Sequence, residues 1–389
     1  MPPRSERLNN LPPYVFSVIG DRLRELQAQG INVIRLDIGN PDMPPPSDVV
    51  DRLAASAANP ANHGYTGYRG DAAFRRAVAD YYQRRFNVEL HPDKEVLPLI
   101  GSKEGIVNLS LAYLDKGDIG LVPDIGYPSY SMGALLAGGD VHWVAVREDN
   151  DFLPDLMAIP VDVLERARLL WVNYPNNPTG VTVEQSFYER VAAFCVEHDI
   201  LLVSDNAYID VVYDGYKAPS ALQTDVGRSH TVELFSFSKS YNMAGWRLGA
   251  AVGPENAISD LLRVKSNIDS GHFKAIYDAG TTALNNISPS WIEERNAVYQ
   301  RRRDRVMAAL PSIGLSARLP GGALYVWARV EGGDMTQYVE DALTQAHVSI
   351  APGLAYGPGG AQHVRISLGV PDDQLEIALE RLQSWYANR

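Results

Sequence analysis

A lysine that follows two serines is the first candidate for chemistry in this sequence. Ser236 and Ser238 precede Lys239, and Arg247 follows it eight positions later. The apolar run 231–235 before them predicts a buried strand, and open α/β sheets bind ligands just past their strand ends. A desolvated lysine there can lose its proton and form a Schiff base with a carbonyl. Taken alone, the segment would equally suit a surface lysine in a loop.

A carboxylate follows another apolar run and is hard to explain by packing alone. Asp205 comes directly after the run 200–204, and Tyr208 follows three residues later. A carboxylate buried at a strand end needs a cation or several hydrogen-bond donors. We therefore expect Asp205 to face a positively charged group, with the Tyr208 hydroxyl near the same site.

Three turns after predicted strands carry weaker signals. Ser102 can cap a helix whose free N–H groups bind an anion, although a plain helix cap would have the same sequence. Tyr127 can lie against a planar ligand or simply cover the core. Asn177 precedes Pro178, which holds it extended, in a rigid Asn-Pro-Thr-Gly turn.

These groups together describe one ligand. Lys239 suits a carbonyl, Asp205 a basic ring nitrogen, and Tyr127 a flat ring. Hydroxyls and a guanidinium near one point suit a phosphate monoester. Pyridoxal 5′-phosphate has all of these groups, and a lysine with an aspartate partner for the pyridinium nitrogen is typical of its sites. Arg365 stands in an apolar alternating segment, where it faces a carboxylate or lies on the wet side of a sheet.

The elements that must position these residues follow an α/β pattern. From Glu95 onward, short apolar runs alternate with helical segments; the runs lie at 96–100, 119–122, 141–146, 169–173, 200–204, 231–235 and 247–252. Nearly continuous apolar strands separated by helices predict a mostly parallel sheet covered on both faces. The last run follows its predecessor after a long loop and is the candidate for an antiparallel exception.

The length of 389 residues predicts two domains rather than one simple core. We expect a large α/β domain at 46–287, entered through the stiff connector Pro44-Pro45-Pro46, and a small α+β domain from 1–45 and 288–389. A long charged helical pattern at 288–310 carries the basic run 301–303, which we interpret as a solvated face.

Composition excludes several other classes of protein. A net charge of −12 without a dense basic tract argues against nucleic acid as a partner. The single cysteine, Cys195, excludes an internal disulfide framework, fits a reducing cytoplasm and is expected to pack in the core. The N-terminus lacks the features of a secretory signal, and no apolar stretch approaches the ~20 residues that span a bilayer. The eight histidines are scattered, so no metal site is expected.

The ordered motifs resemble the class I and II aminotransferases of fold type I over nearly the whole chain. The resemblance implies a large domain whose mostly parallel seven-stranded sheet lies between helices, a smaller α+β domain, pyridoxal 5′-phosphate, and amino transfer between an L-amino acid and a 2-oxo acid, with 2-oxoglutarate and glutamate as the expected pair. Several stretches are similar to the LL-diaminopimelate aminotransferase branch: 11–16, 38–42, 100–105, 239–247 and 265–271. Aminotransferases for alanine and other neutral amino acids share most of these stretches.

The resemblance also implies a role for each matching residue around the cofactor ring. Lys239 would bond the cofactor and carry the proton between Cα and C4′, and Asp205 would keep the pyridinium protonated. Tyr208 and Asn177 would hold the ring oxygen, and Tyr127 would stack on the ring.

Further residues are implied at the two ends of the site. The phosphate ligands would be Ser102, Lys103 through its backbone N–H, Ser236, Ser238 and Arg247. Tyr65 would reach the phosphate of a neighbouring subunit, which implies a homodimer with shared active sites. The substrate ligands would be Arg365, which clamps the α-carboxylate, with Gly39, Asn177, Tyr14 and Lys103. No residue is assigned to a distal carboxylate.

Three other functions match parts of the sequence. Ser236-x-x-Lys239 and Ser204-Asp205-Asn206 match motifs of penicillin-binding enzymes, but their order is reversed, Lys-Thr-Gly is absent and no helical pattern opens at Ser236. A regulator that uses this fold as an effector sensor would need a DNA-binding domain, which the first 45 residues do not supply. A pyridoxal-phosphate β-lyase has the same cofactor motifs and stays open.

Overall fold

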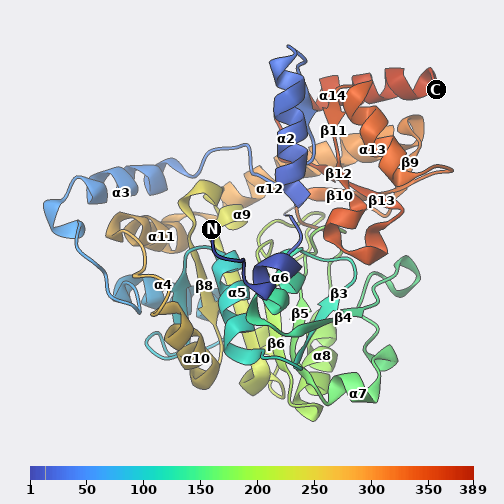
Figure 1. Ribbon diagram of the computed structural model, residues 1–389. Helices are drawn as coiled ribbons and strands as arrows, with labels where there is room; N and C mark the ends of the chain where they lie inside the picture. Colours follow the sequence, from blue (N-terminus) through green and yellow to red (C-terminus); the bar gives the residue numbers. More distant parts are fainter. Residues whose placement is uncertain (14) are drawn as a thin grey trace.

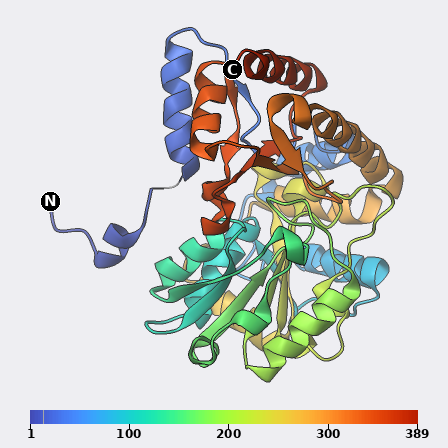
Figure 2. The same cartoon turned by 90° about the vertical axis from the view of Figure 1, so that its right-hand side faces the viewer.

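A computed structural model describes residues 1–13 and 15–389. Tyr14, a predicted substrate contact, therefore lies outside the described residues. In Figure 1 the largest sheet and its helices occupy the lower part of the molecule, and α2 (Val15–Ala28) stands above them with the C-terminal helices and strands. The first residues, with α1 (Glu6–Asn10), extend away from the body in Figure 2.

The main sheet has seven strands in the order β2-β8-β7-β6-β5-β3-β4. β8 pairs antiparallel with both of its neighbours, and all other pairs are parallel. Both the mostly parallel sheet and its antiparallel exception are thus confirmed. The bounds are β2 Val96–Leu99, β3 Ile119–Pro123, β4 Asp140–Val144, β5 Ala167–Val172, β6 Leu201–Asn206, β7 Thr231–Ser236 and β8 Gly249–Val252.

Helices cover both faces of this sheet, which explains why its strands read as unbroken apolar runs. On β5, Leu169 and Trp171 pack into one core cluster, whereas Leu170 and Val172 pack into another. Side chains of successive strand residues point to opposite faces, so each face of the sheet carries its own buried layer. The covering helices are α4 Ala72–Phe86, α5 Ser102–Tyr113, α6 Ser129–Ala137, α7 Val161–Leu164, α8 Gln185–Glu197, α10 Glu255–Lys265 and α11 Lys274–Asn286, and α3 Ser47–Ala57 packs against α11.

The remaining elements gather around a second, smaller sheet of order β12-β13-β10-β9. A two-stranded parallel pair, β1 with β11, completes this part. Its bounds are β1 Ile34–Arg35, β9 Leu315–Ala317, β10 Tyr325–Val330, β11 Val348–Ser349, β12 Ala351–Pro352, β13 His363–Ser367, α2 Val15–Ala28, α12 Pro289–Ala309, α13 Met335–Thr344 and α14 Asp372–Ala387. We propose that 1–45 and 288–389 form a small domain and 46–287 a large one, because most of this core cluster comes from residues 299–385 together with Ile34 and Leu36.

Between Ile31 and Ile38 the chain forms a strand of only two residues, because β1 pairs solely with the equally short β11. One local expectation differs from the structure. A one-turn helix, α9 (Phe237–Ser240), does begin after Ser236, whose hydroxyl caps it by accepting from the Ser238 N–H at 3.2 Å. So short a helix contains no hydrophobic repeat by which the sequence could reveal it.

The interpretation of the basic run on α12 as a solvated face is wrong for two of its three arginines. Arg302 and Arg303 are 6% and 2% exposed. Arg302 donates to Asp42 at 2.7 and 2.9 Å, and Arg303 donates to Asp214. Because α12 packs against α14 and β10, this side of the helix faces protein, and a buried guanidinium requires such carboxylate partners.

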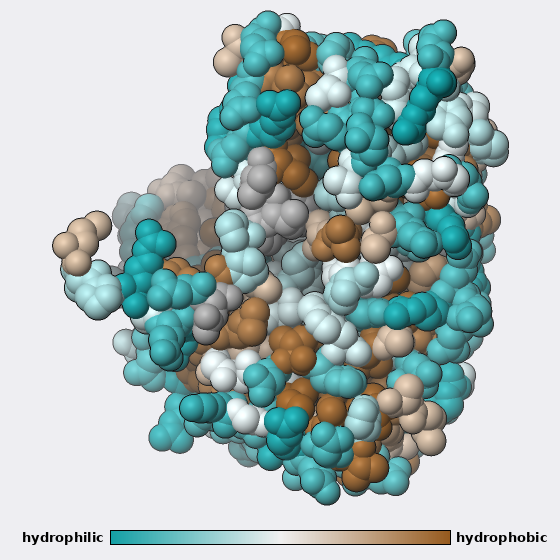
Figure 3. Space-filling view, turned by 45° about the vertical axis from the view of Figure 1, so that its right-hand side comes forward, coloured by the Kyte–Doolittle hydropathy of each residue, from teal (hydrophilic) through white to brown (hydrophobic). Residues whose placement is uncertain are grey.

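One face of the protein is mostly hydrophilic (Figure 3), and its single cysteine lies in the core. Cys195 is free and fully buried, as predicted. Figure 3 shows hydrophilic side chains over much of one face, with hydrophobic patches mainly on its lower half. No helix within the described ranges is both long and apolar enough to cross a membrane. Across the same ranges, no cluster of three or more His, Cys, Asp or Glu side chains could hold a metal ion.

Candidate active site

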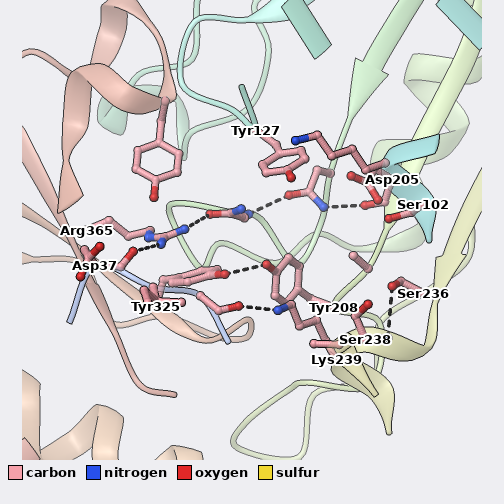
Figure 4. A pocket seen from close by; sticks show the side chains of 18 of the residues that line it. Asp37, Ser102, Tyr127, Asp205, Tyr208, Ser236, Ser238, Lys239, Tyr325 and Arg365 are labelled. Atoms are coloured by element: carbon pink, nitrogen blue, oxygen red, sulfur yellow. Dashed lines mark hydrogen bonds between the residues drawn. The ribbon is translucent and has the colours of Figure 1, made fainter. Parts of the chain in front are cut away.

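The carboxyl ends of β5, β6 and β7 open into a cavity of about 410 Å³. Residues of the small sheet close its other side, so the cavity combines elements from both ends of the chain (Figure 4). Twelve predicted site residues line it: Gly39, Ser102, Lys103, Tyr127, Asn177, Asp205, Tyr208, Ser236, Ser238, Lys239, Arg247 and Arg365. Tyr65 does not line the cavity and is 91% exposed.

Lys239 lies on α9, directly after β7, with its amine inside the cavity. Its Nζ donates to the Gly39 carbonyl oxygen, across the boundary between the two proposed domains. Burial lowers the pKa of Lys239 to about 7, with smaller contributions in the same direction from Arg365 and Arg247. An amine with a pKa this low is substantially neutral near pH 7 and can act as a nucleophile or a base.

Asp205 is the penultimate residue of β6 and is almost fully buried, at 4% exposure. Its Oδ2 accepts a hydrogen bond from the Tyr130 hydroxyl at 2.9 Å, and the Tyr130 ring stacks on Trp171 at 5.1 Å. Its Oδ1 is buried without a hydrogen-bond partner in the described part of the chain. Burial raises the pKa of Asp205 to about 6, and the hydrogen bond from Tyr130 acts in the opposite direction. The carboxylate is thus held in place with one oxygen free for a cation.

The middle of the cavity is lined by hydroxyl and amide groups. The Tyr208 and Tyr325 hydroxyls hydrogen-bond each other at 2.7 Å. Asn177 lies in the turn after β5, its peptide bond to Pro178 is cis, and its N–H donates to the Asn173 side chain at 2.7 Å. Tyr208 and Asn177 both line the cavity, so each can offer a polar group to a ligand there.

The end of the cavity near α5 is rich in hydroxyl and N–H donors. Ser102 begins α5, and Gly101 before it has φ +75°; a Cβ at Gly101 would collide with the Arg247 guanidinium. The Arg247 carbonyl in turn accepts from His272 Nε2 at 2.7 Å, which fixes the backbone that carries the guanidinium. A helix N-terminus beside an arginine is a site for an anion such as phosphate.

Arg365 occupies the opposite end, on β13, and is 3% exposed. The sequence left open whether it faces a carboxylate or lies on the wet side of a sheet, and its burial in the cavity rules out the second. Its guanidinium lies 3.9 Å from the centre of the Tyr325 ring and donates to Asn177 Oδ1 at 3.0 Å. The Nε is buried without a partner among the residues described. The guanidinium can therefore donate hydrogen bonds to a ligand carboxylate.

Several residues that shape the cavity were not assigned from the sequence. They are Arg35, Asp37, Ile38, Asn173, Ala207, Ala244, Tyr325 and Tyr356, with Tyr130 behind Asp205. Asn173 could have been noticed, since it opens the Asn-Pro turn after β5. The others come from distant segments and had no local signal.

The residues present fit pyridoxal 5′-phosphate. The free Oδ1 of Asp205 suits a protonated ring nitrogen, and the donors around Ser102, Ser236 and Arg247 suit the phosphate. Lys239, whose Nζ lies within the cavity, suits the aldehyde. In Figure 4, Asp205, Ser102, Ser236 and Ser238 lie on one side of the cavity, and Arg365 and Asp37 lie on the other. The cavity therefore has one end that suits the cofactor and another end that suits a substrate carboxylate.

Comparison with known proteins agrees with this geometry. The family model for aminotransferase class I and II matches residues 31–382. The LL-diaminopimelate aminotransferase of Moorella thermoacetica is 46% identical over 97% of both chains. Among solved structures, BacF from Bacillus subtilis has a TM-score of 0.95 at 35% identity over 99% of both chains. A probable N-succinyldiaminopimelate aminotransferase from Thermus thermophilus has a TM-score of 0.89 at 36% identity, covering 95% of this chain and 100% of that one. The chain therefore belongs to the class I and II aminotransferases, enzymes that use pyridoxal 5′-phosphate to move amino groups between amino acids and 2-oxo acids.

Proposed function

We propose that this enzyme works in the cytoplasm and transfers an amino group from LL-diaminopimelate to 2-oxoglutarate, which yields glutamate. The amino transfer rests on one observation above all. A single cavity is lined by Lys239, whose pKa is lowered, by Asp205, a buried carboxylate with a free oxygen, and by the buried Arg365. The choice of donor is supported by the relatives named LL-diaminopimelate aminotransferase, which are 41–46% identical over nearly the whole chain.

Substrate binding would begin at Arg365. The stacked Tyr325 and Tyr356 rings hold the guanidinium in place, at 3.9 and 4.7 Å from the ring centres. Its bond to the Asn177 side chain would yield to the α-carboxylate of the amino acid, which makes a stronger, charge-assisted pair. This contact would orient the substrate Cα toward Lys239 and Gly39.

Proton transfer would belong to Lys239. When bound, pyridoxal 5′-phosphate supplies an electron sink that stabilises negative charge at the substrate Cα. With a pKa of about 7, the freed lysine amine could take the proton from Cα and deliver it to the cofactor carbon C4′. The Gly39 carbonyl, which accepts from Nζ, would hold the amine in this position.

The cofactor would be held at both of its polar ends. Asp205 would keep the ring nitrogen protonated through its free oxygen, and Tyr208 with Asn177 would hold the ring hydroxyl oxygen. Tyr127 would cover the ring face. The phosphate would be bound by Ser102, the backbone N–H of Lys103, Ser236, Ser238 and Arg247.

We also propose that the active unit is a homodimer in which Tyr65 serves the neighbouring site. Two loops beside the phosphate end expose apolar and aromatic side chains: Tyr65 91%, Tyr68 57%, Ile268 57% and Phe273 37%. Thr66 Oγ1 donates to the His272 carbonyl at 3.1 Å, so these loops lie together. Exposed patches of this kind mark interfaces. Light scattering should give twice the chain mass of 42.8 kDa, and a monomer that transaminates at full rate would contradict shared sites.

A donor panel tests the proposed substrate. With 2-oxoglutarate as acceptor, we expect LL-diaminopimelate to give the highest kcat/KM, ahead of alanine and other neutral amino acids. Turnover of alanine without turnover of LL-diaminopimelate would overturn this choice and favour a neutral amino-acid aminotransferase. Product analysis separates the remaining alternative, because transfer yields glutamate whereas a β-lyase yields pyruvate and ammonia.

A further inference from the structure

Two charged residues at the substrate end of the cavity have no role in the reaction described above. Arg35, at the end of β1, and Asp37 both line the cavity. The Asp37 side chain is fully buried, whereas the Arg35 side chain is 35% exposed. Arg35 Nε donates to Asp37 Oδ1 at 3.0 Å, and Nη2 donates to Oδ2 at 2.6 Å. The buried carboxylate thus holds the arginine by one edge of its guanidinium.

The same aspartate also contacts the arginine that receives the α-carboxylate. Arg365 Nη2 donates to the Asp37 backbone carbonyl at 2.7 Å. One residue therefore holds two guanidinium groups, one through its backbone and one through its side chain. In Figure 4, Asp37 lies beside Arg365, far from Asp205 and Ser102. Arg35, which is bonded to Asp37, therefore lies at this end of the cavity, close to the guanidinium that would bind the α-carboxylate.

The guanidinium of Arg35 keeps donors available for a ligand. A guanidinium has five N–H donors in a fixed fork, and the two bonds to Asp37 use Nε and one hydrogen of Nη2. Within the described residues, Arg35 Nη1 has no hydrogen-bond partner. The edge formed by Nη1 and Nη2 can bind a second carboxylate in the bidentate geometry that arginine favours.

We infer that Arg35 binds the side-chain carboxylate of a dicarboxylic substrate while Arg365 binds its α-carboxylate. This inference rests on the proposed function. It assigns Arg35 to binding of 2-oxoglutarate and glutamate, and Asp37 is the residue that positions Arg35. Because both arginines are hydrogen-bonded to the same aspartate, the distance between the two carboxylates of a bound ligand would be short and fixed. A monocarboxylic 2-oxo acid would use only Arg365.

Arg35→Gln in the holoenzyme tests this assignment through a ratio of affinities. The probes are glutarate and pentanoate, which differ by one carboxylate and do not react, and their binding is followed by the absorbance of the bound cofactor. We expect Kd for glutarate to rise about 10- to 100-fold, the loss typical of a charge-assisted hydrogen bond, with Kd for pentanoate unchanged. In single turnovers of the amino form, kcat/KM for 2-oxoglutarate should fall by a similar factor while that for pyruvate is retained.

Three further variants separate recognition from damage to the fold. Arg35→Lys should recover part of the glutarate affinity. Arg35→Gln combined with Asp37→Asn leaves no unpaired buried carboxylate and should show the same ratio as Arg35→Gln alone. Arg22→Gln, which removes an exposed arginine paired with Glu25, should leave both affinities unchanged. Equal losses for glutarate and pentanoate, or no loss for glutarate, would overturn the assignment. If LL-diaminopimelate is not a donor but the ratio still shifts, only the donor proposal fails.

Discussion

Replacing Lys239 with alanine should lower turnover by at least about 10⁴-fold, the upper range for loss of a general acid–base group, because the covalent attachment to the cofactor is lost as well. The amine contacts the Gly39 carbonyl and has a pKa lowered to about 7. Among the described residues, Lys103 on α5 is the only other lysine that lines the cavity. The measurement is kcat with the best donor, together with the mass of the protein after borohydride reduction.

The mass measurement discriminates between roles for this lysine. In the native enzyme, reduction should fix the cofactor to a peptide that contains Lys239, and in Lys239→Ala no cofactor should remain after denaturation. Lys116→Ala, at an exposed lysine distant from the cavity, should behave like the native enzyme in both assays. A Lys239→Ala variant that still retains reduced cofactor would refute the assignment.

Asp205→Asn is expected to lower kcat by about 10- to 150-fold, which corresponds to the 1.5–3 kcal/mol typical of a charged hydrogen bond. A neutral amide cannot hold a proton on the ring nitrogen, so less negative charge can be accommodated in the transition state. Arg365 lies at the other end of the cavity, and KM for the donor should therefore change little. Asp199→Asn, at a fully exposed site, is the matched control, and an unchanged kcat in Asp205→Asn would rule out this role.

The same variant should stabilise the cofactor-free protein at neutral pH. Burial raises the pKa of Asp205 from 3.8 to about 6, so the native state binds the proton more tightly than the unfolded state. The protonated Asp205 carboxyl therefore contributes stability below pH 3.8, and this contribution is lost as the pH rises through 6. Above pH 6, Asp205→Asn should raise Tm of the apoenzyme although it lowers kcat. A lower Tm of Asp205→Asn at pH 8 would show that the ionised carboxylate does not destabilise the cofactor-free protein.

Much of the large domain could be predicted because each of its elements carries a local signal. The parallel strands are buried on both faces, and this double burial produces the apolar runs that mark β5, β6 and β7. Helix α11 was not predicted, although it is 13 residues long. Its buried face consists largely of small residues, Ala275, Ala279, Gly280 and Ala283, so it has few of the large apolar side chains that mark a helix in a sequence. The two arginines of α12 were misjudged for a related reason, since partners 70 or more positions away decide their burial.

The sequence by itself determined the lysine segment, the segments around Asp205 and Asn177, and hence the cofactor, because these proposed cofactor residues lie at or just after the end of a strand whose position is readable. Only the tertiary structure decided how Arg365 is used and that Arg35, Asp37 and Tyr325 lie opposite Lys239. These residues reach the cavity through pairings such as β1 with β11 and β13 with β10. The fold also decides the chemical state of Lys239. A lysine after a strand is only a candidate nucleophile, and burial beside Arg365 and Arg247 lowers its pKa into the working range.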